Sequence, residues 1–441
     1  MGTAITFYSY KGGVGRSMAL ANIGVILANW GKKTLLIDWD LEAPGLENYF
    51  NTLIPSDYGI TNKDGLIDLL ALRAENAGYD TRSIQWEKYL TSIPIPSPIP
   101  GARPNSNLYL LTSGKKDDGY ISRVKQFDFS NFYNEKDGGE FLEDLRDNWK
   151  KKFDYILIDS RTGLTDSSGI CSIHMPDIVV ALFTATEQGF KGTLNAVNTA
   201  KSRQAELVYD RLKLKVLPIP TRLDNSELRL TEEWLVKFAN DLTDIYKDFI
   251  TLDKDENLTI QPLEVLKKTK IPYISFYGYG EKLSILEQGS DDPNSLGYAY
   301  ETIAAILVNN FQDVAKLKDD RDGYIKIARG EEVMDYSYFQ KKIAAEQEEK
   351  KKLEELLRFR ETEQLQKELR LQNQLKNSRL ITYAIAGILV LAVIIYFVVF
   401  NPKNRTSSDD FTNKSDSTVA AKDSSKPIMD TTVKILDSTK K

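Results

Sequence analysis

The segment KGGVGRS (residues 11–17) sets three glycines among two cations and a hydroxyl, a composition that could bind phosphate. Glycines carry no side chain, so the backbone N–H groups of such a loop can turn towards an anion. An apolar run precedes the loop and a helical pattern follows it, and a helix amino terminus adds partial positive charge. Ser17 can then offer its hydroxyl to Mg²⁺ beside the phosphates. The predicted nucleotide-binding residues of this segment are Lys11, Gly12, Gly13, Val14, Gly15, Arg16, Ser17 and Met18.

Acidic residues end two further apolar runs. The run TLLIDWD places Asp38 and Asp40 at the end of a predicted strand, and the run YILID ends in Asp159. Parallel strands of an open α/β sheet bring their carboxyl ends to one edge, where ligands bind. Carboxylates at that edge can hold the water shell of Mg²⁺. We therefore expect Ser17, Asp38 and Asp159 to form a magnesium site next to the phosphate loop.

Short β-branched runs alternate with helical patterns from residue 1 to about residue 320. This alternation predicts an α/β fold, a mostly parallel, doubly wound sheet with helices on both faces. A helix is expected from Ser17 to Asn29, ended by Gly31. Residues 93–104 are rich in proline, and we expect an extended surface connection there. The predicted strands are residues 4–10, 34–38, 108–112, 155–159, 178–183 and 215–220.

The composition excludes several kinds of site. The chain has 441 residues, a formal net charge of −5, one cysteine and one histidine. A disulfide scaffold, a zinc cluster and a Cys/His nucleophile pair all lack their parts. We therefore expect Cys171 to be a small buried residue and His174 a loop or packing residue. The acidic balance argues against a general nucleic-acid binder.

The carboxyl-terminal part of the chain has a different character. Residues 335–378 are rich in Glu, Lys, Gln and Leu, and they predict a long helix that is either a weak coiled coil or a solvated stalk. Residues 380–400 carry no charge and would form about 30 Å of helix, the thickness of a bilayer core, which predicts a transmembrane helix. The polar residues 401–441 are expected to be disordered.

Three motifs, KGGVGRS, DWD and DYILIDS, resemble the phosphate loop, switch aspartates and metal-site aspartate of ParA/MinD-type P-loop ATPases, over about residues 1–314. The longer motifs KGGVGRSMALAN, DWDLEAPGL and DSRTG are similar to a subgroup with a KGGVGR variant motif. The resemblance implies ATP and Mg²⁺ as cofactors and an ATP-dependent homodimer, in which Lys11 reaches the phosphates of the other subunit. It implies that Asp40 positions the attacking water. Thr221 and Asp224 either contact the base or belong to an ordinary strand-end loop.

Two features depart from the wider family pattern. Arg16 stands where lysine is usual before Ser17, and DSRTG (residues 159–163) replaces the more usual DTPPG. Arginine keeps the charge and can bind phosphate through two N–H groups, but it is longer and planar. We favour a rebuilt phosphate site over a broken one. Arg161 could enter that site or form a structural salt bridge.

The expected function is a membrane-anchored, Mg-ATP-dependent dimerisation switch that recruits or regulates an unidentified protein partner. The alternative is an ATP-sensing scaffold with little or no hydrolysis. We expect a single-pass protein of the cytoplasmic membrane, with the ATPase domain inside and the tail outside. A tyrosine kinase is disfavoured because no tyrosine follows Tyr396. DNA partitioning is disfavoured because the chain is anchored and acidic, and no specific nucleic-acid partner is expected.

Overall fold

The computed structural model describes residues 1–54, 59–76, 84–96, 105–163, 169, 173–206, 212–252, 258–331 and 336–400. The chain divides into two compact units, Met1–Met334 and Asp335–Lys441. The predicted buried position of Cys171 and the predicted disorder of residues 401–441 lie outside the described residues, as does most of the proline-rich segment.

The first unit is built on an eight-stranded sheet with the order β3-β4-β2-β5-β1-β6-β7-β8. All neighbouring strands are parallel except β3 and β4, so the predicted mostly parallel, doubly wound α/β fold is confirmed. The strands are β1 (Thr3–Ser9), β2 (Thr34–Asp38), β3 (Leu90–Ile95), β4 (Asn105–Leu111), β5 (Tyr155–Asp159), β6 (Ile178–Thr184), β7 (Lys215–Leu223) and β8 (Ile271–Pro272).

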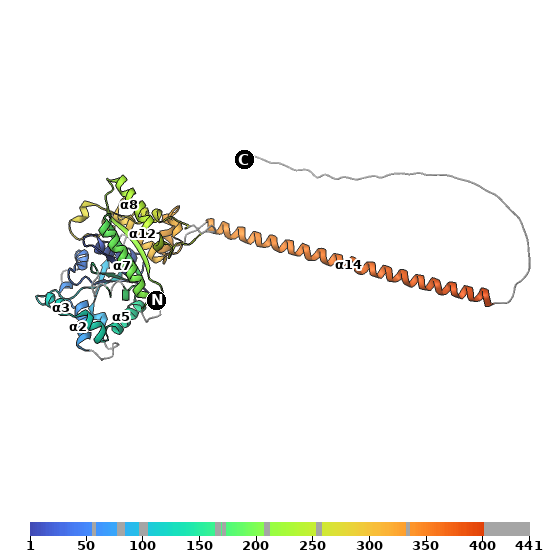
Figure 1. The fold of residues 1–441 in the computed structure, drawn as a ribbon, viewed down its shortest axis with the longest axis horizontal. Coiled ribbons are helices and arrows are strands. Elements are labelled where there is room, and N and C mark those ends of the chain that lie inside the picture. The colour runs from blue at the N-terminus through green and yellow to red at the C-terminus, as the bar shows by residue number, and fades with distance from the viewer. Residues whose placement is uncertain are drawn as a thin grey trace, which may run out of the picture. The chain divides into compact units, whose positions relative to one another are not determined.

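Helices surround this sheet (Figure 1). They are α1 (Arg16–Asn29), α2 (Leu66–Glu75), α3 (Tyr120–Gln126), α4 (Phe129–Glu135), α5 (Gly138–Lys152), α7 (Glu187–Ala205), α8 (Leu228–Asp241), α9 (Thr243–Tyr246), α10 (Pro262–Thr269), α11 (Ser284–Gln288), α12 (Leu296–Val308) and α13 (Arg321–Arg329). Short 3₁₀ segments include η1 (Leu46–Phe50) and η5 (Trp86–Tyr89). The predicted helix over residues 17–29 corresponds to α1, which ends before Gly31 as expected.

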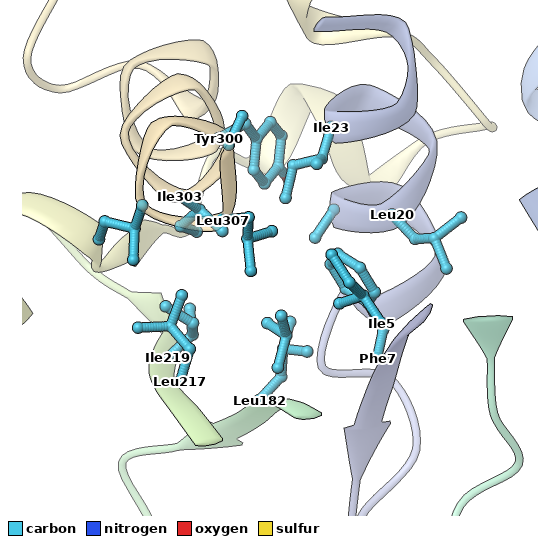
Figure 2. Close-up of a cluster of buried hydrophobic side chains, with 14 of the residues drawn as sticks. Ile5, Phe7, Leu20, Ile23, Leu182, Leu217, Ile219, Tyr300, Ile303 and Leu307 are labelled. Atoms are coloured by element: carbon cyan, nitrogen blue, oxygen red, sulfur yellow. The ribbon is translucent and has the colours of Figure 1, made fainter. Parts of the chain in front are cut away.

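Each face of the sheet has its own apolar core, because alternate strand residues point to opposite faces. On one face, β1 packs against α1 and α12, and this core continues over β6 and β7 (Figure 2). On the other face, Ile156 and Ile158 of β5 join Phe141 and Trp149 of α5. The strands are thus covered by helices on both sides, which explains their nearly continuous apolar sequence. Figure 2 labels Ile5, Phe7, Leu20, Ile23, Leu182, Leu217, Ile219, Tyr300, Ile303 and Leu307.

The prediction of an extended connection over residues 93–104 is wrong at its beginning. Residues 93–95 end the edge strand β3, which pairs antiparallel with β4 and has an irregular register between Ile93 and Ile95. Pro94 lies at that irregularity. Proline lacks an N–H donor, and edge strands and bulges are the places in a sheet that tolerate it. The proline content therefore concealed a strand, and the two-residue β8 was too short to give a sequence pattern.

The second unit contains the helix α14 (Tyr336–Phe400), drawn in orange in Figure 1. It is one continuous helix across the two segments that the sequence predicts as a stalk and a membrane span. Among the described residues, one helix is long and apolar enough to cross a bilayer by length and composition, and it lies within Lys350–Tyr396. Such a helix alone is weak support for a membrane span.

His174 is a buried packing residue, and its surroundings predict a pH-dependent stability. The imidazole Nδ1 lies 2.8 Å from the Tyr133 hydroxyl, Nε2 lies 3.3 Å from Glu143, and Arg146 pairs with that same carboxylate. Burial, helped by the charge of Arg146, lowers the pKa of His174 to about 4. The folded protein therefore resists protonation of this ring more than the unfolded chain does.

Because the folded pKa of His174 lies below the unfolded value, its protonation favours the unfolded chain. Stability should therefore be lost as the pH falls from above 6.5 towards 4. Between pH 7 and pH 5 the free energy of unfolding should fall by about 2 kcal/mol from this group. Urea unfolding of the wild type and of His174→Gln at both pH values checks this. An equal pH dependence in the two proteins would show that His174 does not contribute.

Candidate nucleotide-binding site

The glycine loop between β1 and α1 has a backbone that only glycine adopts easily. Gly13 and Gly15 have φ values of 71° and 87°, in the left-handed region. A Cβ built on Gly12, Gly13 or Gly15 would meet nothing within 4 Å, so the loop borders open space. No side chain caps the amino terminus of α1, and Gly15 occupies the N-cap position. The N–H groups of the first helical turn are therefore available to an anion.

Three parallel strands bring the predicted acidic residues to the same edge as this loop. In the sheet register Asp38 of β2 lies beside Asp159 of β5, and Phe7 of β1 lies on the other side of Asp159. Adjacent strands are about 4.8 Å apart, so the two carboxylates are neighbours. The prediction that these residues converge at the carboxyl edge is confirmed.

Arg16 does not point into the glycine loop but towards the carboxylates. Its Nε donates to Asp159 Oδ1 at 2.5 Å, and its Nη2 donates to Asp40 Oδ2 at 2.8 Å. Nη1 lies 3.4 Å from the hydroxyl of Ser9. Arg16 is 7% exposed. Burial disfavours its charged form, but Asp159 and Asp40 outweigh that effect and raise the pKa of Arg16. The guanidinium thus bridges the end of β5 and the loop that follows β2.

Asp38 supports the backbone that follows β2. Its carboxylate accepts hydrogen bonds from the N–H groups of Asp40, Gly45 and Leu46 at 3.0–3.2 Å. Burial, reinforced by the charge of Asp159, raises the pKa of Asp38 to about 7 despite these bonds. This aspartate therefore holds the loop that carries Asp40, and it lies beside Asp159 in the register.

The other predicted residues of the loop have distinct positions. Lys11 is exposed, and Ser17 is half-buried in the first turn of α1. Val14 is buried in the apolar core between the sheet and the helices α1 and α12, and Met18 packs against the same core. These last two side chains therefore anchor the loop, and their contribution to a phosphate site would come through the backbone.

The two residues predicted from the family pattern, Thr221 on β7 and Asp224 in the loop after it, differ in their surroundings. Thr221 is fully buried within the sheet, with its hydroxyl 3.4 Å from the carbonyl oxygen of Phe183. Asp224 is exposed, and its carboxylate accepts hydrogen bonds from the N–H and hydroxyl of Ser226. Asp224 therefore stabilises its own turn in this structure.

Arg222, which no sequence motif singles out, contacts the glycine loop. Its Nη1 donates to the carbonyl oxygen of Gly13 at 2.7 Å, and its guanidinium lies 4.8 Å from the ring centroid of Tyr273. Its φ of 56° is unusual for a residue other than glycine. Such strained positions often occur at functional sites. The sequence feature that could have identified Arg222 as a site residue was its position near the end of a predicted strand, next to Thr221.

Arg161 pairs with Glu42 at 2.5 Å, so it forms a salt bridge between the loops that follow β5 and β2. Of the two alternatives for Arg161, the structural salt bridge is the one seen. This pair links the DSRTG segment to the loop carrying Asp40.

The residues present suit Mg²⁺ held together with a nucleotide. Ser17, Asp38 and Asp159 offer oxygen atoms, which Mg²⁺ prefers. Within the part of the chain that the structure describes, no three Asp, Glu, His or Cys side chains gather into a metal cage. Mg²⁺ at nucleotide sites is commonly held by one or two carboxylates, waters and the phosphates themselves, so a complete protein cage is not required.

Sequence comparisons relate this chain to known nucleotide-binding proteins. Residues 5–354 match the family described as the CobQ/CobB/MinD/ParA nucleotide binding domain. The septum site-determining protein MinD of Synechocystis sp. is 23% identical over 300 residues, which cover 66% of this chain and 92% of that protein. MinD of Helicobacter pylori is 26% identical over 246 residues, covering 53% of this chain and 74% of that protein.

Similar solved structures include MinD of Pyrococcus horikoshii complexed with Mg-ADP. It has 17% identity and a TM-score of 0.44, covering 73% of this chain and 100% of that one. A second is a Borrelia burgdorferi plasmid partition protein bound to AMPPNP, with 20% identity, a TM-score of 0.43 and coverage of 70% and 99%. Since the family match extends over residues 5–354 of the 441, this chain belongs to the CobQ/CobB/MinD/ParA nucleotide-binding family.

Proposed function

We propose that this protein is a Mg-ATP-dependent dimerisation switch, anchored in a membrane, that recruits or regulates a protein partner there. Binding of ATP between two copies closes the dimer, the partner recognises the closed form, and hydrolysis resets it. The observation that carries the proposal is the uncapped glycine loop, which lies next to Asp40 and Asp159 and exposes Lys11.

The proposed roles of the residues follow their positions and the family resemblance. The loop N–H groups bind the phosphates, Ser17 and Asp159 serve Mg²⁺, and Asp38 keeps the loop carrying Asp40 in place. Asp40 positions the attacking water. By the family resemblance, the exposed Lys11 reaches phosphates bound by a second copy of the chain. We also propose that the protein belongs to the KGGVGR variant subgroup, which the arginine at position 16 supports.

The membrane anchor is proposed from the apolar part of α14. The large apolar side chains between Leu380 and Tyr396 are more than half exposed, with Ile388 67% and Leu389 61% exposed, which suits lipid better than water. We place the first unit in the cytoplasm and residues 401–441 outside. A protease added to intact cells should then remove only the residues after the span. Loss of the first unit under the same treatment would reverse this topology.

A second candidate, an ATP-sensing scaffold with little hydrolysis, is favoured by one observation. The carboxylate assigned to the attacking water, that of Asp40, is already bound to Arg16. If Arg16 kept this contact with ATP in place, the nucleotide would be bound but scarcely hydrolysed.

Phosphate release from the purified full-length chain in detergent, supplied with Mg-ATP, separates these two functions. The switch predicts steady turnover well above that of buffer, together with a conversion of dimer to monomer. Tight binding of a fluorescent ATP analogue with no phosphate release would favour the sensor instead.

A further inference from the structure

We propose that Arg16 is an internal counter-cation. This positioning residue neutralises Asp40 and Asp159 in the nucleotide-free protein, so that a divalent cation does not bind to the two carboxylates without a nucleotide. A nucleotide then has to draw the guanidinium away before the carboxylates can serve a metal. This inference rests on the proposed function and describes how the same site is regulated.

The contacts of Arg16 are those of a residue that replaces a cation. Its guanidinium bonds through Nε to Asp159 at the end of β5 and through Nη2 to Asp40 in the loop after β2. The side chains of Arg16 and Asp159 are 8% and 2% exposed, so water does little to screen their charges. Charged groups this deeply buried are stable only when they are paired.

Arginine suits this double contact better than the usual lysine. The donors of a guanidinium lie in one plane and point in fixed, different directions, so one side chain can bridge two carboxylates. Here Nε and Nη2 reach separate aspartates, and Nη1 points towards Ser9. A lysine ammonium is a single point charge on a flexible stem and would hold such a bridge less firmly. The substitution that marks the loop therefore has a structural consequence beyond phosphate binding.

The same charges explain why a metal alone should bind weakly. The charges of Asp40 and Asp159 would otherwise attract a divalent cation, and Asp38 already engages the backbone through both oxygens. With Arg16 in place, an incoming cation would compete for Asp40 and Asp159 and would lie next to a positive charge. Nucleotide phosphates offer the guanidinium another anion, because Arg16 is the first residue of the helix at the end of the glycine loop. Metal and nucleotide should therefore enter together.

Mn²⁺ binding to the metal-stripped, nucleotide-free full-length chain tests the inference, with free Mn²⁺ measured by electron paramagnetic resonance. Wild type should bind Mn²⁺ weakly, whereas Arg16→Met should bind it at least tenfold more tightly. Arg16→Lys, which keeps the charge but not the bridge, should fall between them. Arg229→Met removes a surface arginine of α8 and should behave as wild type, which excludes an effect of net charge alone.

The gain in affinity must also depend on the aspartates. Adding Asp159→Asn to Arg16→Met should return Mn²⁺ binding to the wild-type level, and circular dichroism should show that each variant is folded. Equal Mn²⁺ affinity of wild type and both Arg16 variants, or a gain that survives Asp159→Asn, would overturn the inference.

A measurement with nucleotide distinguishes failure of the proposed function from failure of the counter-cation inference. A non-hydrolysable ATP analogue should bring tight Mn²⁺ binding to the wild type. If the analogue does not bind at all, the proposed function is wrong, while the difference between wild type and Arg16→Met without nucleotide still reports on the counter-cation.

Discussion

Replacing Asp40 with alanine should reduce phosphate release by roughly 10²–10³-fold, the usual effect of losing one group that acts on the transition state. In the proposed site the glycine loop binds phosphate through backbone N–H groups, so ATP binding should survive. Hydrolysis would no longer reset the switch, and the ATP-bound dimer should accumulate. Phosphate release and light scattering with Mg-ATP measure the two effects on the same sample.

Glu42→Ala is the matched control for this substitution. Glu42 lies two residues further along the same loop, its side chain is 55% exposed, and it contacts Arg161 rather than Arg16. It should retain turnover within a few-fold of wild type. An Asp40→Ala protein that hydrolyses ATP at the wild-type rate would show that Asp40 does not position the attacking water. The contact between Asp40 and Arg16 would then need another explanation.

Replacing Lys11 with alanine should abolish ATP-dependent dimerisation and lower turnover by about 10²-fold or more. The proposed contact joins Lys11 of one copy to phosphates bound by the other, so it exists only in the dimer. The loop glycines and α1 are unchanged, and each monomer should still bind ATP. Light scattering with a non-hydrolysable ATP analogue gives the mass, and a fluorescent analogue gives the affinity.

The control for charge is Lys88→Ala, which removes an exposed lysine of η5, next to the edge strand β3. This variant should dimerise and hydrolyse ATP as wild type does. A Lys11→Ala protein that still forms dimers with the analogue would exclude the intersubunit role and leave Lys11 as a residue of its own monomer.

The part of the site that depends on strand ends could be predicted from the sequence. Asp38 and Asp159 each end a short apolar run, and parallel strands bring such ends together whatever the details of the helices. Six of the strands are recognisable in the sequence because burial on both faces makes their residues continuously apolar. The strand β3 was missed because Pro94 resembles a loop signal in a place where an edge strand tolerates it.

The orientation of side chains could not be predicted in this way. Arg16 is adjacent to Ser17 in a phosphate loop, so its sequence position suggests phosphate as the partner. Its actual partners lie 24 and 143 residues away along the chain, and only the three-dimensional fold brings them within hydrogen-bonding distance. Arg222 was missed for a similar reason, because its contact with Gly13 spans 209 residues.

The most direct test of the proposed switch follows mass and phosphate release together after one limited addition of Mg-ATP to the wild-type protein in detergent. If the switch operates as proposed, the mass rises to that of a dimer at once and falls back as phosphate appears, and Mg-ADP alone produces no dimer. A mass that stays constant while phosphate is released would contradict the claim that ATP hydrolysis controls the association of two copies.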